Sequence, residues 1–505
     1  MVVNILIKKG AYHDSVTLML ISRLVKSSSG VRRASVMMAT PPNKEVLKDS
    51  GLFNDLVESA NSADLVIAVE AEDQASATLA LQAAEQALTG ESSQPDQQDE
   101  SVPLRTISQG LRHCEGANLA FISVPGIYAA AEALKALKAG LNVFLFSDNV
   151  SLEDEVNLKK EAHKRGLLVM GPDCGTSLIK GVPLGFVNSV RSGCIGIVGA
   201  SGTGIQEVMS TLERSGSGIS HAFGTGSRDL SEAVGGITMF EVLNILENDV
   251  HTKVIVVLSK PPAQAIVEKI FKRLSNSSKP VIVYFQGGCG DQKVGLNVQI
   301  ANTLEHVTAL AVALERKEVV PNPELFKTSF PGLKRANTGY LRGLFSGGTL
   351  AKEALILIQA RLDKVFSNLS SENSTTMENA GHSIIDFGDD QFTLGRPHPM
   401  IDITYRMEQF SRDALDPRVR VILMDIVLGY GAHPDPSREF GPVIAKALNG
   451  ARADGRTLDV VLSIVGTDSD PQCYSTQVEN FRLAGAITAS TTAQATGTAL
   501  KLLGV

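Results

Sequence analysis

The stretch CIGIVGASGTGIQEVMSTLERSG, residues 194–216, constrains the fold more than any other part of the chain. It begins with β-branched residues between glycines, which is typical of a central strand in a parallel sheet. Small residues follow, and from Ile205 apolar residues recur at helical spacing. A turn of small residues that opens a helix leaves backbone N–H groups at the positive end of the helix dipole. The stretch therefore predicts a strand–turn–helix unit, which either binds an anion or is only a tightly packed turn.

Composition narrows the class of protein. The 505 residues suffice for three or four domains, and a hydrophobic content of 43% allows most of the chain to bury a core. The net charge of −7, without a long basic run, argues against nucleic acid and membrane partners. The five scattered cysteines have no metal-ligand spacing, so we expect reduced thiols, no metal site and a cytoplasmic location. No apolar run approaches the ~20 residues of a membrane span, and the first apolar run is too short for a signal peptide.

Alternation of strand-like and helix-like segments predicts a multidomain α/β protein. Residues 1–90 are expected to form a small ferredoxin-like α/β domain, and the polar, acidic residues 91–103 a linker. Three further α/β units are expected at residues 104–190, 191–330 and 334–505. A polar insert at residues 367–381 is expected to be a mobile surface loop.

Two more glycine-rich loops follow predicted strands. GLFSGGTLAKEA, residues 343–354, repeats the strand–glycine–helix pattern of residues 194–216, and a repeated phosphate turn is less expected by chance than a single one. QGGCGDQ, residues 286–292, is the second such loop. Candidate substrate-binding residues in these loops are Gly287, Gly288, Gly347, Gly348 and Thr349.

Several motifs resemble those of a known family. GPDC (171–174) and GIVGASGT (196–203) resemble the α subunit of succinyl-CoA synthetase, and residues 383–505 resemble the C-terminal domain of its β subunit. With ATPPNKE (39–45), SGGTL (346–350) and LGYGAHPDP (428–436), the chain is identified as a member of the FdrA family of acyl-CoA synthetase-like proteins. The resemblance implies flavodoxin- or Rossmann-type parallel sheets: a CoA-binding-like domain at 104–190, a ligase-CoA domain at 191–330 and a second flavodoxin-like domain at 334–505.

The resemblance also implies a function. FdrA-like chains are associated with allantoin and purine breakdown, as subunits of an oxamate carbamoyltransferase that converts oxalurate and phosphate to oxamate and carbamoyl phosphate. Other carbamoyltransferase subunits, a second copy of the chain and a small anionic substrate are the partners it implies. An acyl-CoA synthetase and a non-catalytic scaffold subunit remain the alternatives.

The chain also departs from the synthetases. Residues 286–296 contain no histidine to carry a phosphate, and SKPPAQ, residues 259–264, contains no acid to hold one. Residues 104–118 lack the glycine-rich CoA turn, and no segment resembles the nucleotide-binding ATP-grasp domain. These departures count against CoA as a cofactor and leave phosphate or carbamoyl phosphate as the expected ligand.

By the same resemblance, two helix N-termini hold one phosphate from opposite sides, at residues 201–204 and 429–433. The expected phosphate-binding residues are Ser201, Gly202, Thr203, Gly204, Gly429, Tyr430, Gly431 and Ala432.

Two side chains are the catalytic candidates. His433 can donate a proton near neutral pH, or it is a loop histidine that caps Asp435 or the next helix. Arg228 can pair with a substrate carboxylate as a bidentate fork, or it forms a surface salt bridge. Cys174 and Cys289 have no sequence-adjacent base, so we expect small packed thiols rather than nucleophiles.

Overall fold

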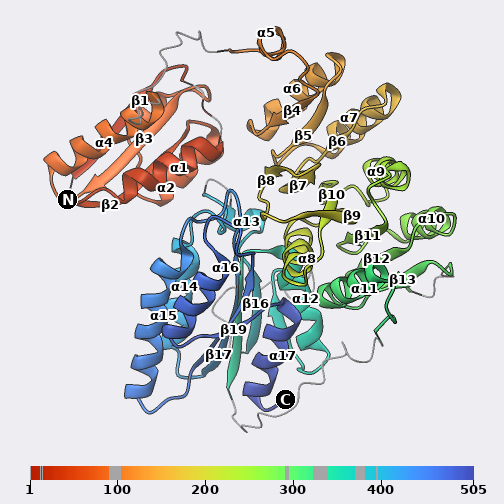
Figure 1. Ribbon diagram of the computed structural model, residues 1–505. Helices are drawn as coiled ribbons and strands as arrows, with labels where there is room; N and C mark the ends of the chain where they lie inside the picture. Colours follow the sequence, from red (N-terminus) through yellow and green to blue (C-terminus); the bar gives the residue numbers. More distant parts are fainter. Residues whose placement is uncertain are drawn as a thin grey trace. The chain divides into compact units, whose positions relative to one another are not determined.

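The computed structural model describes residues 2–11, 13, 15–89, 104–290, 295–321, 339–369, 381–393 and 396–505 (Figure 1). The expected linker at 91–103, most of the polar insert at 367–381, residues 291–292 and the end of the unit expected at 191–330 lie outside these residues. The chain forms two compact units. The smaller comprises Met1–Ala117, Ser123–Tyr128 and Asp390–Pro397, and the larger comprises the rest.

The N-terminal region is an antiparallel sheet of order β1-β3-β2 with helices on both faces. Helices α1 and α4 pack on each other and on one face, around Leu65, Ile67 and Val69. The alternate residues Val66 and Ala68 face a second apolar cluster, which includes side chains of α2 and α3. The elements are β1 (Val2–Lys8), α1 (Ser15–Lys26), β2 (Val31–Met38), α2 (Pro41–Asp49), α3 (Asp55–Ser59), β3 (Leu65–Ala71) and α4 (Gln74–Thr89).

Residues 104–185 contain a small parallel sheet of order β4-β5-β6 and a hairpin that joins another sheet. The elements are α5 (Ile107–His113), β4 (Leu119–Ile122), α6 (Gly126–Lys138), β5 (Asn142–Leu145), α7 (Leu152–Arg165), β6 (Val169–Met170), β7 (Thr176–Ile179) and β8 (Val182–Gly185). Strand β7 pairs antiparallel with β10, so the hairpin β7–β8 belongs to the sheet that contains β10. The sequence had assigned this hairpin to the unit that ends at residue 190.

The first lobe, residues 191–316 with the hairpin β7–β8, is built on a seven-stranded sheet of order β13-β12-β11-β9-β10-β7-β8. Its five parallel strands have the flavodoxin order 2-1-3-4-5. The elements are β9 (Ser192–Ala200), α8 (Gly202–Arg214), β10 (Ile219–Gly224), α9 (Ile237–Asn248), β11 (Val254–Ser259), α10 (Gln264–Leu274), β12 (Val281–Phe285), β13 (Val298–Ile300) and α11 (Leu304–Arg316).

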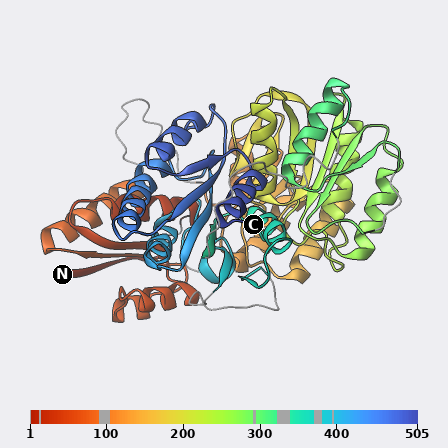
Figure 2. The ribbon, with the colours of Figure 1, turned by 90° about the horizontal axis from the view of Figure 1, so that it is seen from below.

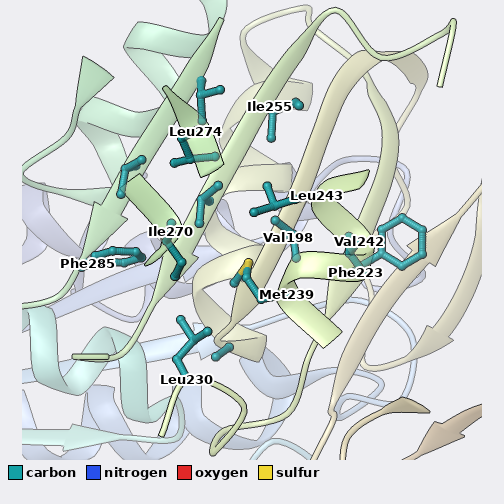
Figure 3. Close-up of a cluster of buried hydrophobic side chains, with 14 of the residues drawn as sticks. Val198, Phe223, Leu230, Met239, Val242, Leu243, Ile255, Ile270, Leu274 and Phe285 are labelled. Atoms are coloured by element: carbon teal, nitrogen blue, oxygen red, sulfur yellow. The ribbon is translucent and has the colours of Figure 1, made fainter. Parts of the chain in front are cut away.

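The core of the first lobe explains why these strands read as continuous apolar runs. Figure 3 shows side chains of the sheet, such as Val198, Ile255 and Phe285, packed against Leu243 of α9 and Ile270 of α10. Helices α8 and α11 pack on the same strands from the other side, so both faces of the sheet are covered (Figure 2). A parallel sheet covered on both faces needs apolar residues at successive positions.

The second lobe, residues 339–505 apart from 390–397, has a parallel sheet of order β15-β16-β14-β17-β18-β19. Without the edge strand β15, the order is again 2-1-3-4-5. The elements are β14 (Tyr340–Phe345), α12 (Gly348–Gln359), β15 (Val365–Ser367), β16 (His382–Asp386), α14 (Thr404–Leu415), β17 (Val419–Val427), α15 (Pro436–Ala453), β18 (Asp459–Val465), α16 (Tyr474–Leu483), β19 (Ile487–Ala489) and α17 (Thr492–Leu503). The expected multidomain α/β class with parallel sheets is confirmed. Among the described residues, no helix is long and apolar enough to cross a membrane.

A buried glutamate from each lobe caps a helix of the other. The Glu207 carboxylate on α8 accepts hydrogen bonds from the N–H and Oγ1 of Thr492, at the start of α17. The Glu353 carboxylate on α12 accepts from the N–H of Leu304, at the start of α11, and from the Tyr284 hydroxyl. A carboxylate at a helix N-terminus satisfies amides that have no intrahelical acceptor. The two lobes are therefore fastened by reciprocal caps.

These caps make stability depend on pH. Burial raises the pKa of Glu207 to about 7, and burial together with the charge of Glu207 raises that of Glu353 to about 8. Both values exceed the usual 4.5, so the folded state binds more protons than the unfolded state between pH 4.5 and 8. The free energy of unfolding should therefore fall as the pH rises through that range. The slope, measured by urea unfolding, should be smaller in Glu353→Gln and unchanged in the exposed control Glu268→Gln.

Candidate functional site

The first wall of the site is the turn that opens α8. Strand β9 lies between β10 and β11, where the strand order of the sheet reverses, and α8 leaves from its carboxyl end. A Cβ on Gly199 would lie 2.6 Å from the carbonyl oxygen of Leu258, so only glycine allows β9 to approach β11 this closely. Ser201 then caps the helix, because its Oγ accepts from the N–H of Gly204 at 3.2 Å.

The second wall is the matching turn that opens α12. The Asp425 carboxylate, at the end of β17, accepts from the N–H groups of Ser346 and Gly347, each at 2.8 Å. The same carboxylate pairs with the guanidinium of Arg406, and both side chains are buried. The buried ion pair therefore fixes the direction in which the chain turns from β14 into α12.

The two turns meet. The hydroxyl oxygens of Ser201 and Thr349 lie 2.6 Å apart, and a Cβ on Gly347 would lie 2.8 Å from the Oγ1 of Thr203. The side chain of Gln286, at the end of β12, donates to the carbonyl oxygen of Thr349 at 2.7 Å. Two positive helix ends therefore adjoin. Each helix end carries roughly half a unit of positive charge, so both helix dipoles stabilise an anion bound at this place.

A carboxyl group and an amine face the start of α12. Asp386 ends β16, and a Cβ on Gly348 would lie 2.6 Å from its Oδ2 and 4.0 Å from the Nζ of Lys260. Burial raises the pKa of Asp386 to about 7. The neighbouring His398 is half-buried, and desolvation lowers its pKa to about 4, so this imidazole is neutral at neutral pH. The site thus combines two helix ends with one cation and one carboxyl group that titrates near neutrality.

The structure brings residues 347–349, rather than the expected loop at residues 429–433, into contact with residues 201–204. The loop has contacts of its own. The N–H of Gly429 donates to the Gln472 side chain, and that of Tyr430 donates to the carbonyl oxygen of Val187. A Cβ on Gly431 would lie 2.9 Å from the Phe186 ring, so this loop packs on residues 185–188. Residues 429–432 precede the helix rather than open it, because α15 begins at Pro436 and is capped by Asp435.

The two catalytic candidates both have partners within the protein. The Nδ1 of His433 accepts from the N–H of Asp435 at 3.1 Å, and its Nε2 lies 3.0 Å from a carboxylate oxygen of Glu439. This geometry matches the capping role that the sequence left open. The Nε of Arg228 donates to Glu155 at 2.9 Å, so the guanidinium serves an ion pair, although with a buried rather than a surface carboxylate.

The remaining loop candidates are partly placed. Gly287 and Gly288 follow β12 with φ of 85° and 100°, and no atom would lie within 4 Å of a Cβ on either. Burial raises the pKa of the Cys174 thiol to about 12 and also raises that of Cys289, which agrees with packed thiols. Sequence reasoning missed Asp386 altogether. Its only signal was an acid at the end of an apolar strand and before a glycine, in IIDFG.

Three family models match separate parts of the chain. A model described as the AllF heavy metal-associated domain matches residues 1–106, the CoA binding domain matches residues 191–287, and CoA-ligase matches residues 344–502. The CoA-binding match thus falls on the first lobe and not on residues 104–190. Residues 1–106 contain no cysteine, and the described part of the chain has no group of three His, Cys, Asp or Glu side chains placed to hold a metal ion. The residues present therefore do not fit a heavy-metal site.

Relatives match either nearly the whole chain or about a third of it. YahF of Escherichia coli strain K12, an uncharacterized protein, is 41% identical over 97% of this chain and 96% of its own length. The α subunit of ADP-forming succinate–CoA ligase from Staphylococcus epidermidis is 27% identical, and the match covers 37% of this chain and 62% of that subunit. This chain therefore spans less than two thirds of the ligase subunits that it matches.

Solved structures also match parts of the chain at low sequence identity. An acetyl-coenzyme A synthetase from Ca. Korarchaeum cryptofilum is 16% identical over 77% of this chain and 82% of its own, with a TM-score of 0.32. The ATP citrate lyase of Methanothrix soehngenii is 15% identical over 46% of this chain and 47% of its own, with a TM-score of 0.34.

A side chain at Gly347 should separate the two turns. Gly347→Val places methyl groups against Thr203, which overpacks the contact and should lower the free energy of unfolding by about 1–3 kcal/mol. Gly450→Ala, in α15, is the matched control because no atom would lie within 4 Å of its Cβ. Urea unfolding measures both. A Gly347→Val variant as stable as the parent chain would contradict the close contact.

His433→Ala should act on stability. The variant leaves the N–H of Asp435 without its acceptor and should cost about 1–3 kcal/mol of unfolding free energy. Phosphate affinity, measured by calorimetry, should stay within about twofold of the parent chain because residues 429–433 do not form the meeting point. Loss of phosphate binding in a folded His433→Ala protein would restore the sequence-based role.

Proposed function

We propose a function on the premise that this chain belongs to the acyl-CoA synthetase-like family that includes YahF of Escherichia coli. The chain transfers an acyl group between phosphate and the thiol of CoA, with the acyl phosphate bound where α8 and α12 meet. CoA is a substrate in this proposal, and the family models for CoA binding and CoA ligation support it.

One observation carries the proposal, the contact between the N-termini of α8 and α12. The hydroxyl groups of Ser201 and Thr349 lie 2.6 Å apart, and both are buried. The first amides of each helix have no intrahelical acceptor, so amides from two lobes are available to one anion. Amides on two sides of the phosphate can stabilise its negative charge while the thiol attacks the carbonyl carbon of the acyl phosphate.

Binding also supplies orientation. The turns that open α8 and α12 lie at the carboxyl edges of parallel sheets, where open α/β folds bind their ligands. Holding the acyl phosphate in one geometry converts a bimolecular encounter into an oriented reaction, which can contribute several kcal/mol to the barrier. Residues 286–296 contain no histidine, so direct transfer between phosphate and thiol, without a phosphohistidine, suits this chain.

A second candidate is carbamoyl transfer. Carbamoyl phosphate is itself an acyl phosphate, and the AllF description of residues 1–106 favours a role in the allantoin-related chemistry that the sequence resemblance implied. The chain would then act as a subunit of an oxamate carbamoyltransferase, with partner subunits or with a second copy of itself. The same anion site would hold the phosphate in either reaction.

The assay offers the purified chain acetyl, propionyl and carbamoyl phosphate with CoA and follows the loss of free thiol. Thioester formation is the expected result. Gly348→Ala, whose Cβ would lie 2.6 Å from Asp386, should lower kcat/KM about 100-fold because it displaces the substrate, while Gly450→Ala should match the parent chain.

Two other outcomes of these assays would overturn the proposed acyl transfer to CoA. If no thioester forms but oxalurate and phosphate yield carbamoyl phosphate, alone or with partner subunits, the second candidate replaces the first. If neither reaction occurs and phosphate does not raise the melting temperature, the scaffold alternative stands and both enzyme proposals are wrong.

A further inference from the structure

Asp386 carries an oxygen for which the protein supplies no donor. The side chain is 94% buried at the carboxyl end of β16, and its Oδ1 accepts from the N–H of Gly388 at 2.8 Å. Its Oδ2 receives no hydrogen bond from the described residues and is directed at the start of α12, 2.6 Å from the position of a Cβ on Gly348. In a residue that is only 6% exposed, a carboxyl oxygen that accepts no hydrogen bond favours the protonated form of the group or the approach of a ligand that donates to it.

A cation from the other lobe faces the same space. Lys260 directly follows β11, and its Nζ lies 4.0 Å from the same Cβ position on Gly348. The residue is exposed, so its ammonium group is reachable from solvent. The N-terminus of α12, the ammonium group of Lys260 and the carboxyl oxygen of Asp386, contributed by both lobes, thus lie around Gly348.

The charges around Asp386 set its proton affinity. Burial raises its pKa to about 7, the N–H of Gly388 and the charge of Lys260 oppose the rise, and the carboxylates of Asp425 and Asp389 add to it. His398 lies beside Gly388, and its own lowered pKa keeps it neutral. Asp386 therefore gains and loses its proton near neutral pH.

We propose that Asp386 is the acid–base group of the acyl transfer and that Lys260 binds the phosphate oxygens of the substrate. This inference rests on the proposed function and names the residues that would perform it. The site then selects a compact, doubly charged acyl phosphate, because the ammonium group and two helix ends together offer charge for two oxygens.

The step balances. The Asp386 carboxylate takes the proton of the attacking thiol, a C–S bond forms at the carbonyl carbon, and the C–O bond to phosphate breaks. The phosphate leaves with the electron pair, held by Lys260 and the helix amides, and receives the proton back from Asp386. Acyl phosphate and thiol thus give thioester and hydrogen phosphate, and in reverse the protonated Asp386 donates to the leaving thiolate.

Asp386→Asn tests the proton transfer. The variant should lower kcat about 100- to 10,000-fold, and the rise of the rate with pH, centred near 7 in the parent chain, should disappear. Asp386→Glu should restore part of the rate with a shifted pH profile, and the exposed control Asp363→Asn should match the parent chain. An Asp386→Asn variant with the parent rate and pH profile would overturn the role.

Lys260→Met tests the anion contact. It should raise the KM for the acyl phosphate about tenfold with little change in kcat, and Lys260→Arg should recover most of the affinity. The control is Lys269→Met, an exposed lysine on α10. A KM unchanged by Lys260→Met would overturn the assignment of Lys260.

Sulfate binding separates this inference from the proposed function. Sulfate keeps its charge across neutral pH, so calorimetry should show that its affinity falls as Asp386 deprotonates, and that Asp386→Asn removes this pH dependence. If these results appear but no acyl phosphate reacts, the proposed function fails and the anion site stands. If sulfate binds with the same affinity and pH dependence in parent, Asp386→Asn and Lys260→Met, the inference fails whatever the reaction.

Discussion

Two helix N-termini that begin against each other are the constraint on which the larger unit depends. Each end carries roughly half a positive charge, so their approach is unfavourable without compensating negative charge. The protein supplies part of that charge with the Asp425 carboxylate, which accepts from Ser346 and Gly347. The hydroxyl contact of Ser201 with Thr349 then joins the two turns. A bound anion at this meeting point would compensate the remaining positive charge of the two helix ends.

The lobes are aligned by groups that are expensive to bury. The pair of Arg406 with Asp425 removes charge from water inside the second lobe, and the Glu207 and Glu353 carboxyl groups, which cap helices across the lobes, do so when they ionise. Buried ion pairs contribute little net stability, but they fix geometry, because removing one partner leaves an uncompensated charge. In this chain the ion pair fixes where α12 starts, and the two glutamates fix the starts of α17 and α11 against the opposite lobe. The alignment of the site is thus obtained at a cost in stability that grows as the pH rises and the glutamates lose their protons.

The fold was largely predictable from the sequence, whereas the partner of the central turn was not. Residues 194–216 combine an apolar run, a glycine-rich turn and apolar residues at helical spacing, which together predict a strand–turn–helix unit. The same pattern at residues 343–354 predicted a second unit of this kind. The sequence cannot say which turns meet, because Ser201 and Thr349 are 148 positions apart and their contact depends on how two sheets face each other. The GYGAH loop attracted attention by its glycines, yet its amides are used by Gln472 and Val187.

Lone residues were the least predictable. Asp386 and Lys260 belong to no motif, and only the positions of β16 and β11 bring them to the same glycine. His433 is the converse case: a histidine between glycine-rich and acidic residues makes the contact with Asp435 that its neighbours in sequence already allowed, and its catalytic role stays a prediction. Chemistry-bearing residues at strand ends are therefore better judged by sheet order than by motif.

The most direct test of the central claim is a crystal soaked with tungstate, a heavy tetrahedral anion whose position is given by its anomalous scattering. The account predicts one strong peak within hydrogen-bonding distance of the first amides of α8 and α12, between Gly202 and Gly348. A peak at residues 429–432 instead, or no peak at the meeting point in crystals that hold the anion elsewhere, would contradict it.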